Sequence, residues 1–81
     1  MVMLYAVDPH GNIVQEEYCQ TKYSRLGTIK RHVGLLYMYC LSEDGAGGIK
    51  AEALNAQRNW VKIPHDSLPK ILQMKILIGA L

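Results

Sequence analysis

Phenylalanine is absent from the sequence and tryptophan occurs once, so five tyrosines supply most of the aromatic area. A tyrosine hydroxyl needs water or a hydrogen-bond partner, which suits tyrosine to half-buried surfaces and interfaces. The 81 residues form a single domain, residues 1–81. A domain of this size buries only roughly 60–65 % of its surface, and oligomerisation is a common source of added stability.

Cysteine is scarce, since Cys19 and Cys40 are the two in the chain. The start of the chain lacks the basic region of a secretory signal, and Asp8 and Pro9 interrupt its apolar run. We therefore expect a cytoplasmic protein, in which the two thiols are free and partly buried rather than joined in a disulfide.

The sequence lacks a motif for catalysis or for metal binding. Its histidines and cysteines occur in no CxxC or HxxxH pair, so nothing local organises a metal site. The glycine-rich stretch 44–50 superficially resembles a phosphate cradle, but Ile49 stands where a P-loop has its lysine. We therefore expect no enzyme activity, no catalytic residue, no metal, no cofactor and no small-molecule substrate.

The N-terminal pattern predicts a β-hairpin. Residues 2–8 form a short apolar run, PHGN at 9–12 has turn composition, and 13–21 resume with β-compatible residues. Proline presets φ in the turn, and Gly11 or Asn12 tolerates a positive φ at its exit. No internal repeat is apparent in the chain.

The middle of the chain, residues 24–41, has two interpretations. Apolar residues at helical spacing favour a helix, whereas Gly27 and Gly34 and the β-branched residues disfavour it. We favour a strand from about Thr28 to Leu41, apolar on both sides in its second half as in a central strand. After a loop at 42–48, residues 49–57 suit either a short helix or a strand, and 59–64 form a short strand that Pro64 stops.

The last part of the chain favours an apolar helix. Asp66 or Ser67 is a candidate cap, and Pro69 is tolerated in a first helical turn. The predicted fold is α+β, with an N-terminal hairpin and antiparallel sheet and a C-terminal helix. The alternative is a small all-β barrel with 70–78 as a strand, because apolar and polar residues alternate there.

The same segment predicts an interface rather than a membrane span. Lys70, Gln73 and Lys75 interrupt it, so it falls short of the about 20 apolar residues that a spanning helix needs. A helix that is apolar on nearly all sides exceeds what one small sheet can cover. We therefore expect a homo-oligomer or another partner chain, contacted by Met74, Leu77, Ile78 and Leu81.

Positive charge is concentrated in residues 22–31, which contain four basic residues and no acid within a chain of net charge +2. On the strand interpretation Arg31 shares a face with two tyrosines, and basic residues beside tyrosines suit single-stranded nucleic acid. The predicted nucleic-acid-binding set is Lys22, Arg25, Lys30, Arg31, Tyr37 and Tyr39.

The stretch YCQTKYSRLGTIKRHV, residues 18–33, partly resembles a helix-turn-helix unit. Cys19 falls where the first helix of such units has a small residue, and Ser24 and Arg25 fall where the second helix opens. The resemblance implies contacts with DNA through Arg25, Lys30 and Arg31.

Two function hypotheses follow from these patterns. The first is a non-enzymatic binding or regulatory protein that contacts nucleic acid through residues 22–31, as a homodimer. The second is a protein–protein interaction module, such as an adaptor, inhibitor or subunit, that docks through its apolar C-terminal segment.

Overall fold

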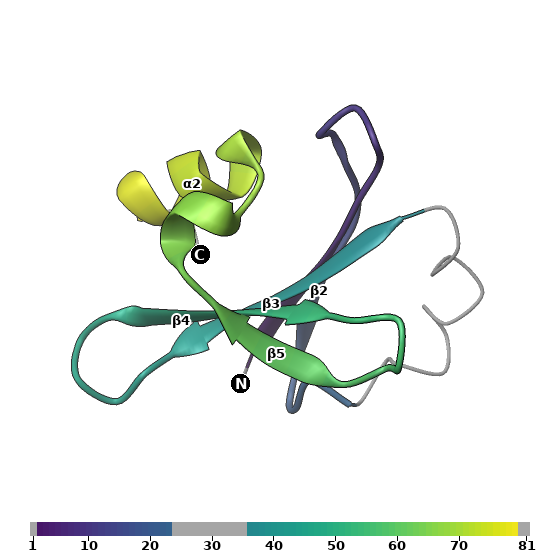
Figure 1. The fold of residues 1–81 in the computed structure, drawn as a ribbon. Coiled ribbons are helices and arrows are strands. Elements are labelled where there is room, and N and C mark those ends of the chain that lie inside the picture. Colours follow the sequence, from purple (N-terminus) through teal and green to yellow (C-terminus); the bar gives the residue numbers. More distant parts are fainter. Residues whose placement is uncertain (1, 24–35, 80–81) are drawn as a thin grey trace.

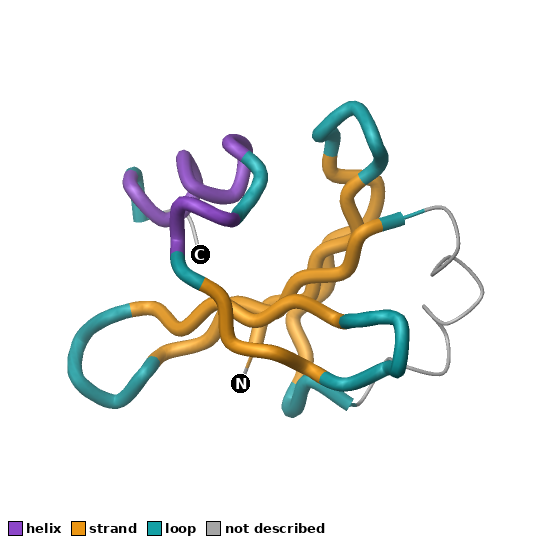
Figure 2. Tube along the Cα trace, viewed as in Figure 1, coloured by secondary structure: helices purple, strands orange, loops and turns teal. Residues whose placement is uncertain are grey.

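The structure is a computed structural model, which describes residues 2–23 and 36–79. The described residues form a five-stranded antiparallel sheet in the order β2-β1-β3-β4-β5 (Figure 1). Its strands are β1 (Val2–Val7), β2 (Ile13–Cys19), β3 (Tyr37–Glu43), β4 (Ile49–Leu54) and β5 (Trp60–Ile63). A 3₁₀ turn, η2 (His65–Ser67), and the helix α2 (Lys70–Leu77) follow. Figure 2 shows this helical layer on one side of the sheet. The predicted α+β fold is confirmed, and the barrel alternative is wrong because 70–77 are helical and the sheet stays open.

The three hairpins of the sheet share one kind of turn. Asp8, Asp44 and Asn55 each begin a connection, and each backbone N–H donates to the carbonyl oxygen four residues later, at 2.9, 3.1 and 3.0 Å. The N–H of that later residue donates in return to the side-chain Oδ1, at 2.9, 3.0 and 2.9 Å. In each turn, the side-chain oxygen of the first residue therefore accepts the backbone N–H that would otherwise need a hydrogen-bond partner in a neighbouring strand. The hairpin predicted at the N-terminus is the first of the three.

The fourth residue of each turn is left-handed. Gly11 has φ +87°, Gly47 has φ +83° and Arg58 has φ +63°. Glycine adopts this conformation without strain, whereas a residue with a Cβ pays about 1–2 kcal/mol. Arg58 is thus the one of these three residues that carries a Cβ in this conformation, and the Asp44 turn contains a second left-handed residue, Gly45 at φ +83°.

Strand β3 is central, as the sequence predicts. It pairs with β1 on one side and with β4 on the other. Met38 and Cys40 are buried on one face of the sheet and Leu41 on the other. The rest of the predicted strand and of its helical alternative, residues 24–35, lies outside the described residues.

Two further sequence interpretations are settled. The alanine-rich segment is the strand β4, paired on both sides, rather than a helix. Cys19 closes the strand β2, so the first helix of the helix-turn-helix interpretation is wrong. Cys19 lies in a strand because β1 pairs with β2 along the length of the hairpin. Val2 is directly opposite Cys19 in that pairing. The two cysteines are not joined in a disulfide, as expected, and both are buried rather than partly buried.

The start of α2 differs from the prediction. Asp66 and Ser67 belong to the 3₁₀ turn, and Pro69 occupies the N-cap position without a side-chain cap. Leu68 is extended, with φ −74° and ψ 153°. A residue that precedes proline is pushed out of the helical region, so the chain breaks at Leu68 and the helix begins at Lys70.

A single stripe of the helix packs on the sheet. Leu72 of the helix is buried and Ile76 is half-buried, in a cluster with Tyr5 and Leu41. Leu68, which precedes the helix, is buried in the same cluster. We call this the helix-side cluster, and its remaining buried members are Val7 and Ala51. Lys75 Nζ adds a polar contact, 3.4 Å from Glu16 Oε1 on β2.

Replacing Arg58 with glycine is expected to stabilise the protein. Removing the left-handed strain outweighs the entropy that glycine adds to the unfolded chain, for a net gain of about 0.5–1 kcal/mol. The matched control Gly11→Ala is expected to cost about 1–2 kcal/mol by strain alone, since a Cβ there meets no atom within 4 Å. Urea unfolding midpoints measure both. A destabilised Arg58→Gly variant would contradict the strain argument.

Two leucines of the last segment are expected to differ sharply. Leu72→Ala removes a side chain that is 0 % exposed and should cost about 2–5 kcal/mol. Leu77→Ala removes one that is 84 % exposed and should change the free energy of unfolding by less than about 0.5 kcal/mol. Chemical unfolding at the lowest usable protein concentration measures each effect. Equal costs would mean that the stripe is assigned to the wrong side of the helix.

Candidate functional site

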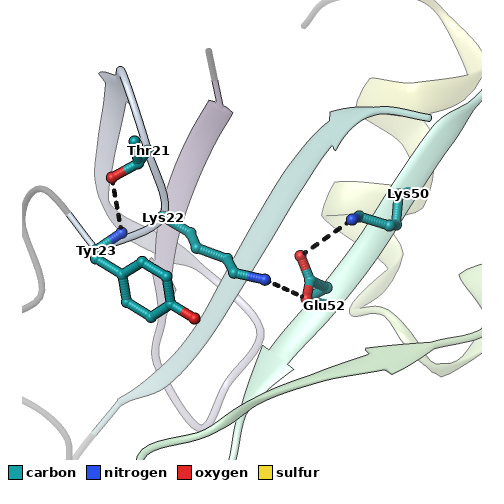
Figure 3. Close-up of polar contacts among 5 residues, drawn as sticks. All are labelled: Thr21, Lys22, Tyr23, Lys50 and Glu52. Atoms are coloured by element: carbon teal, nitrogen blue, oxygen red, sulfur yellow. Dashed lines mark hydrogen bonds and ion pairs between the residues drawn. The ribbon is translucent and has the colours of Figure 1, made fainter. Parts of the chain in front are cut away.

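The basic residue Lys22 is engaged within the protein itself. Its Nζ lies 2.8 Å from Oε2 of Glu52, a buried carboxylate on β4 (Figure 3). Lys50 Nζ lies 3.9 Å from the other oxygen of Glu52. The hydrogen bond to Glu52 raises the pKa of Lys22, so its charge is balanced inside the fold.

The Cys40 thiol, which lies next to Glu52, is unsuited to nucleophilic chemistry. Cys40 lies directly opposite Glu52 in the β3–β4 ladder and is fully buried. Burial, followed by the charge of Glu52, raises the pKa of the Cys40 thiol to about 11. A thiol held protonated in this way is a weak nucleophile at neutral pH.

The predicted nucleic-acid-binding residues are not brought together among the described residues. Tyr39 packs in the helix-side cluster, and Tyr37, two residues earlier on β3, points to the same side and is exposed. Lys22 lies on the opposite face, because it contacts Glu52 and Glu52 is opposite Cys40. The other three members, Arg25, Lys30 and Arg31, lie outside the described residues, so the nucleic-acid hypothesis stays a prediction.

The backbone N–H groups of the glycine-rich loop are hydrogen-bonded to the side chain of Asp44, at the start of the same loop. The carboxylate oxygen Oδ1 of Asp44 accepts hydrogen bonds from Ala46 N–H at 2.7 Å and Gly48 N–H at 3.0 Å. These bonds lower the pKa of Asp44. The N–H groups that a phosphate would use are thus taken by the turn that joins β3 to β4, in agreement with the loop interpretation.

The predicted interface residues lie together on the outer side of α2. Leu77 is 84 % exposed, Ile78 71 % and Met74 62 %. Ile71, three residues before Met74, extends the set and is 36 % exposed. We call these four residues the outer face of α2. Leu81 lies outside the described residues.

A hollow of about 620 Å³ adjoins this face. Its lining combines apolar side chains of α2 with polar ones from η2 and the helix: His65, Asp66, Lys70, Gln73, Met74, Ile76 and Leu77. Two of the polar groups are bonded within the fold. His65 Nε2 donates to the carbonyl of Ile49 at 2.6 Å, and Gln73 Nε2 donates to the carbonyl of Leu68 at 2.8 Å. These bonds fix the wall of the hollow against β4 and the end of η2.

Ile71 is the member that the sequence pattern missed. Its distance from Met74 and Ile78, three and seven residues, is the spacing of one helix stripe. That stripe is visible only once the helix is known to begin at Lys70 and its buried stripe to pass through Leu72.

Within residues 2–23 and 36–79, no three histidine, cysteine, aspartate or glutamate side chains lie close enough together to hold a metal ion. The described helices are also too short to cross a membrane.

No protein-family model, curated protein or solved structure matches this chain.

Substitution of the buried carboxylate is expected to destabilise the fold. Glu52→Gln keeps the shape but leaves Lys22 and Lys50 without a counter-charge, at a cost of about 1–2 kcal/mol. In the Glu52→Gln variant, Lys22→Met should lower the free energy of unfolding by less than it does in the original chain, because Lys22 has already lost the carboxylate that it contacts. Urea unfolding measures the cycle, with Glu43→Gln on the exposed end of β3 as control. Additive losses would show that the two groups do not interact.

Proposed function

We propose that the chain is a protein-binding module that docks through the outer face of α2. The observation that carries the proposal is the pair of stripes on one short helix. Leu72 is fully buried against the sheet, while Met74, Leu77 and Ile78 are 62 %, 84 % and 71 % exposed on the same element. Proteins that act alone rarely leave a contiguous patch of large apolar side chains in water.

The energetics of the outer face favour a partner. Burying one large aliphatic side chain contributes about 1.5–3 kcal/mol. Leu77 and Ile78 project from the last helical turn, and the hollow beside them offers concave surface. The helix is held by the buried Leu72 and by the contact between Lys75 and Glu16, so its outer side chains are presented on a fixed element.

The nucleic-acid alternative has less support from the described residues. Lys22 is neutralised by Glu52, and Tyr37 and Tyr39 lie across the sheet from it. A phosphate-binding surface needs uncommitted positive charge next to stacking platforms. The outer face of α2 needs neither, since apolar burial drives its association.

Site-specific photocross-linking tests the proposal. A benzoylphenylalanine is placed at position 77 in cells that naturally produce the protein, and at position 46, an exposed loop residue, as the control. Adducts with protein are expected at position 77 and not at 46, and Met74→Lys should reduce them several-fold. Adducts that form equally at both positions, or that vanish on nuclease treatment, would contradict a protein-binding face on α2.

A further inference from the structure

We infer that the outer edge of strand β5 is a second binding surface, which accepts an extended acidic peptide as an added antiparallel strand. This surface is separate from the outer face of α2, and the inference does not depend on the proposed function. It follows from the unpaired edge of β5, from the charge on that edge and from two hydrogen-bond donors near its start that have no acceptor.

Strand β5 lies at one end of the sheet and pairs with β4 alone (Figure 1). The N–H of Asn55 donates to the carbonyl of Asn59, so these residues face each other as a hydrogen-bonded pair. In an antiparallel ladder such pairs alternate with pairs whose backbone groups point outward. Counted from this pair, the N–H and C=O groups of Trp60 and Lys62 point away from the sheet, whereas those of Val61 point to β4.

The two faces of the sheet differ along this edge. Lys62 lies opposite Glu52, on the face away from α2, and Trp60 packs against the buried cluster of that face. Val61 points to the side of α2 and is 45 % exposed. An added strand continues both faces, because side chains directly opposite each other lie on the same face. The strand that fits therefore alternates an acid, opposite Lys62, with an apolar residue beside Val61.

The charge of Lys62 is not balanced within the described residues. None of the ion pairs there involves Lys62, and Glu52 is already contacted by Lys22 at 2.8 Å and by Lys50 at 3.9 Å. The N–H groups of its own loop lower the pKa of Asp44 more than Lys62 does. A lysine on an edge strand discourages indiscriminate strand pairing. An acidic strand converts the same lysine into a favourable cross-strand pair.

Two hydrogen-bond donors near the start of β5 lack an acceptor. Nη1 of Arg58 and Nε1 of Trp60 are buried, and neither has a hydrogen-bond partner. Both groups can only donate, so each is stabilised by a nearby carbonyl or carboxylate oxygen. Arg58 also has a φ of +63°, and strained residues cluster at binding sites. Its side chain is half-buried and can turn toward an added strand that extends past Trp60.

A second copy of the chain fits this edge less well. Pairing two β5 strands would bring two basic edges together, and like charges across a strand pair are destabilising. The opposite edge, β2, contains Glu16 and Glu17, but Glu16 contacts Lys75 at 3.4 Å and Glu17 accepts a side-chain hydrogen bond at 2.9 Å. Because these acids are engaged, a separate acidic peptide is the better complement.

Fluorescence anisotropy with a short labelled peptide in which glutamate and valine alternate tests the inference. Since β5 has four residues, the interface is small and we expect a Kd in the micromolar range. N-methylation of the glutamates removes the N–H groups that pair with Lys62 and should weaken binding at least about tenfold. N-methylation of the valines, whose N–H groups point away from β5, is the matched control and should leave binding unchanged.

Two variants separate loss of binding from loss of folding. Lys62→Glu should weaken binding about five- to tenfold. Lys70→Glu, the same change of charge on α2, should leave binding unchanged. Arg58→Gly should weaken binding several-fold and raise the unfolding midpoint, because it removes the guanidinium and the left-handed strain together. A merely disturbed fold would lower both the affinity and the midpoint.

Amide hydrogen exchange identifies the backbone groups that the peptide occupies. Exchange at the N–H groups of Trp60 and Lys62 should slow several-fold when the peptide binds. Exchange at Val61, whose backbone already pairs with β4 in the free protein, should change little.

Six outcomes would overturn the inference. The first four are no binding up to about 1 mM peptide, equal binding of the two N-methylated peptides, unchanged exchange at Trp60 and Lys62, and a Lys62→Glu variant that binds as tightly. The fifth is a single-stranded oligonucleotide that displaces the peptide and binds more tightly, which would make the edge a nucleic-acid surface. The sixth is self-association that Lys62→Glu abolishes, which would make the occupant a second copy.

Discussion

The packing of one narrow helix stripe on the sheet is the constraint on which the rest of the structure depends. Leu68, Leu72 and Ile76 are the only side chains of the described C-terminal segment that join the helix-side cluster. They cover Tyr5 and Leu41 and thereby fix which way the helix faces. The helix is apolar on more than one side, so when one side packs against the sheet, Leu77 and Ile78 on the other side remain exposed to water. The orientation of the helix therefore determines both the core and the candidate interface.

The sheet that receives this helix is built from a repeated local device. Each hairpin turns on a side-chain oxygen of Asp8, Asp44 or Asn55 that accepts the N–H four residues later. A turn of this kind satisfies its own backbone groups and needs little from the remainder of the molecule. The buried area of this small chain therefore consists mainly of apolar side chains on the two faces of the sheet around β3.

Much of the fold could be predicted from local chemistry. Turn residues at 9–12, the stop at Pro64 and the two-sided apolar pattern of Tyr37–Leu41 predicted elements that the structure contains. The alanine-rich β4 could not be assigned, because its two ladder partners decide its conformation. The contact between Lys22 and Glu52 joins residues thirty positions apart and has no local signal. Met74, Leu77 and Ile78 were predicted as interface residues from the apolar surface around the expected helix, and that role stays a prediction, whereas Ile71 required the position of the helix start.

Solvent paramagnetic relaxation enhancement of the methyl signals tests the central claim most directly, because it reports which side chains of the C-terminal helix face water. The account predicts a strong enhancement at Leu77 and Ile78 and almost none at Leu72. A strong enhancement at Leu72, or none at Leu77 and Ile78 in dilute protein, would contradict it.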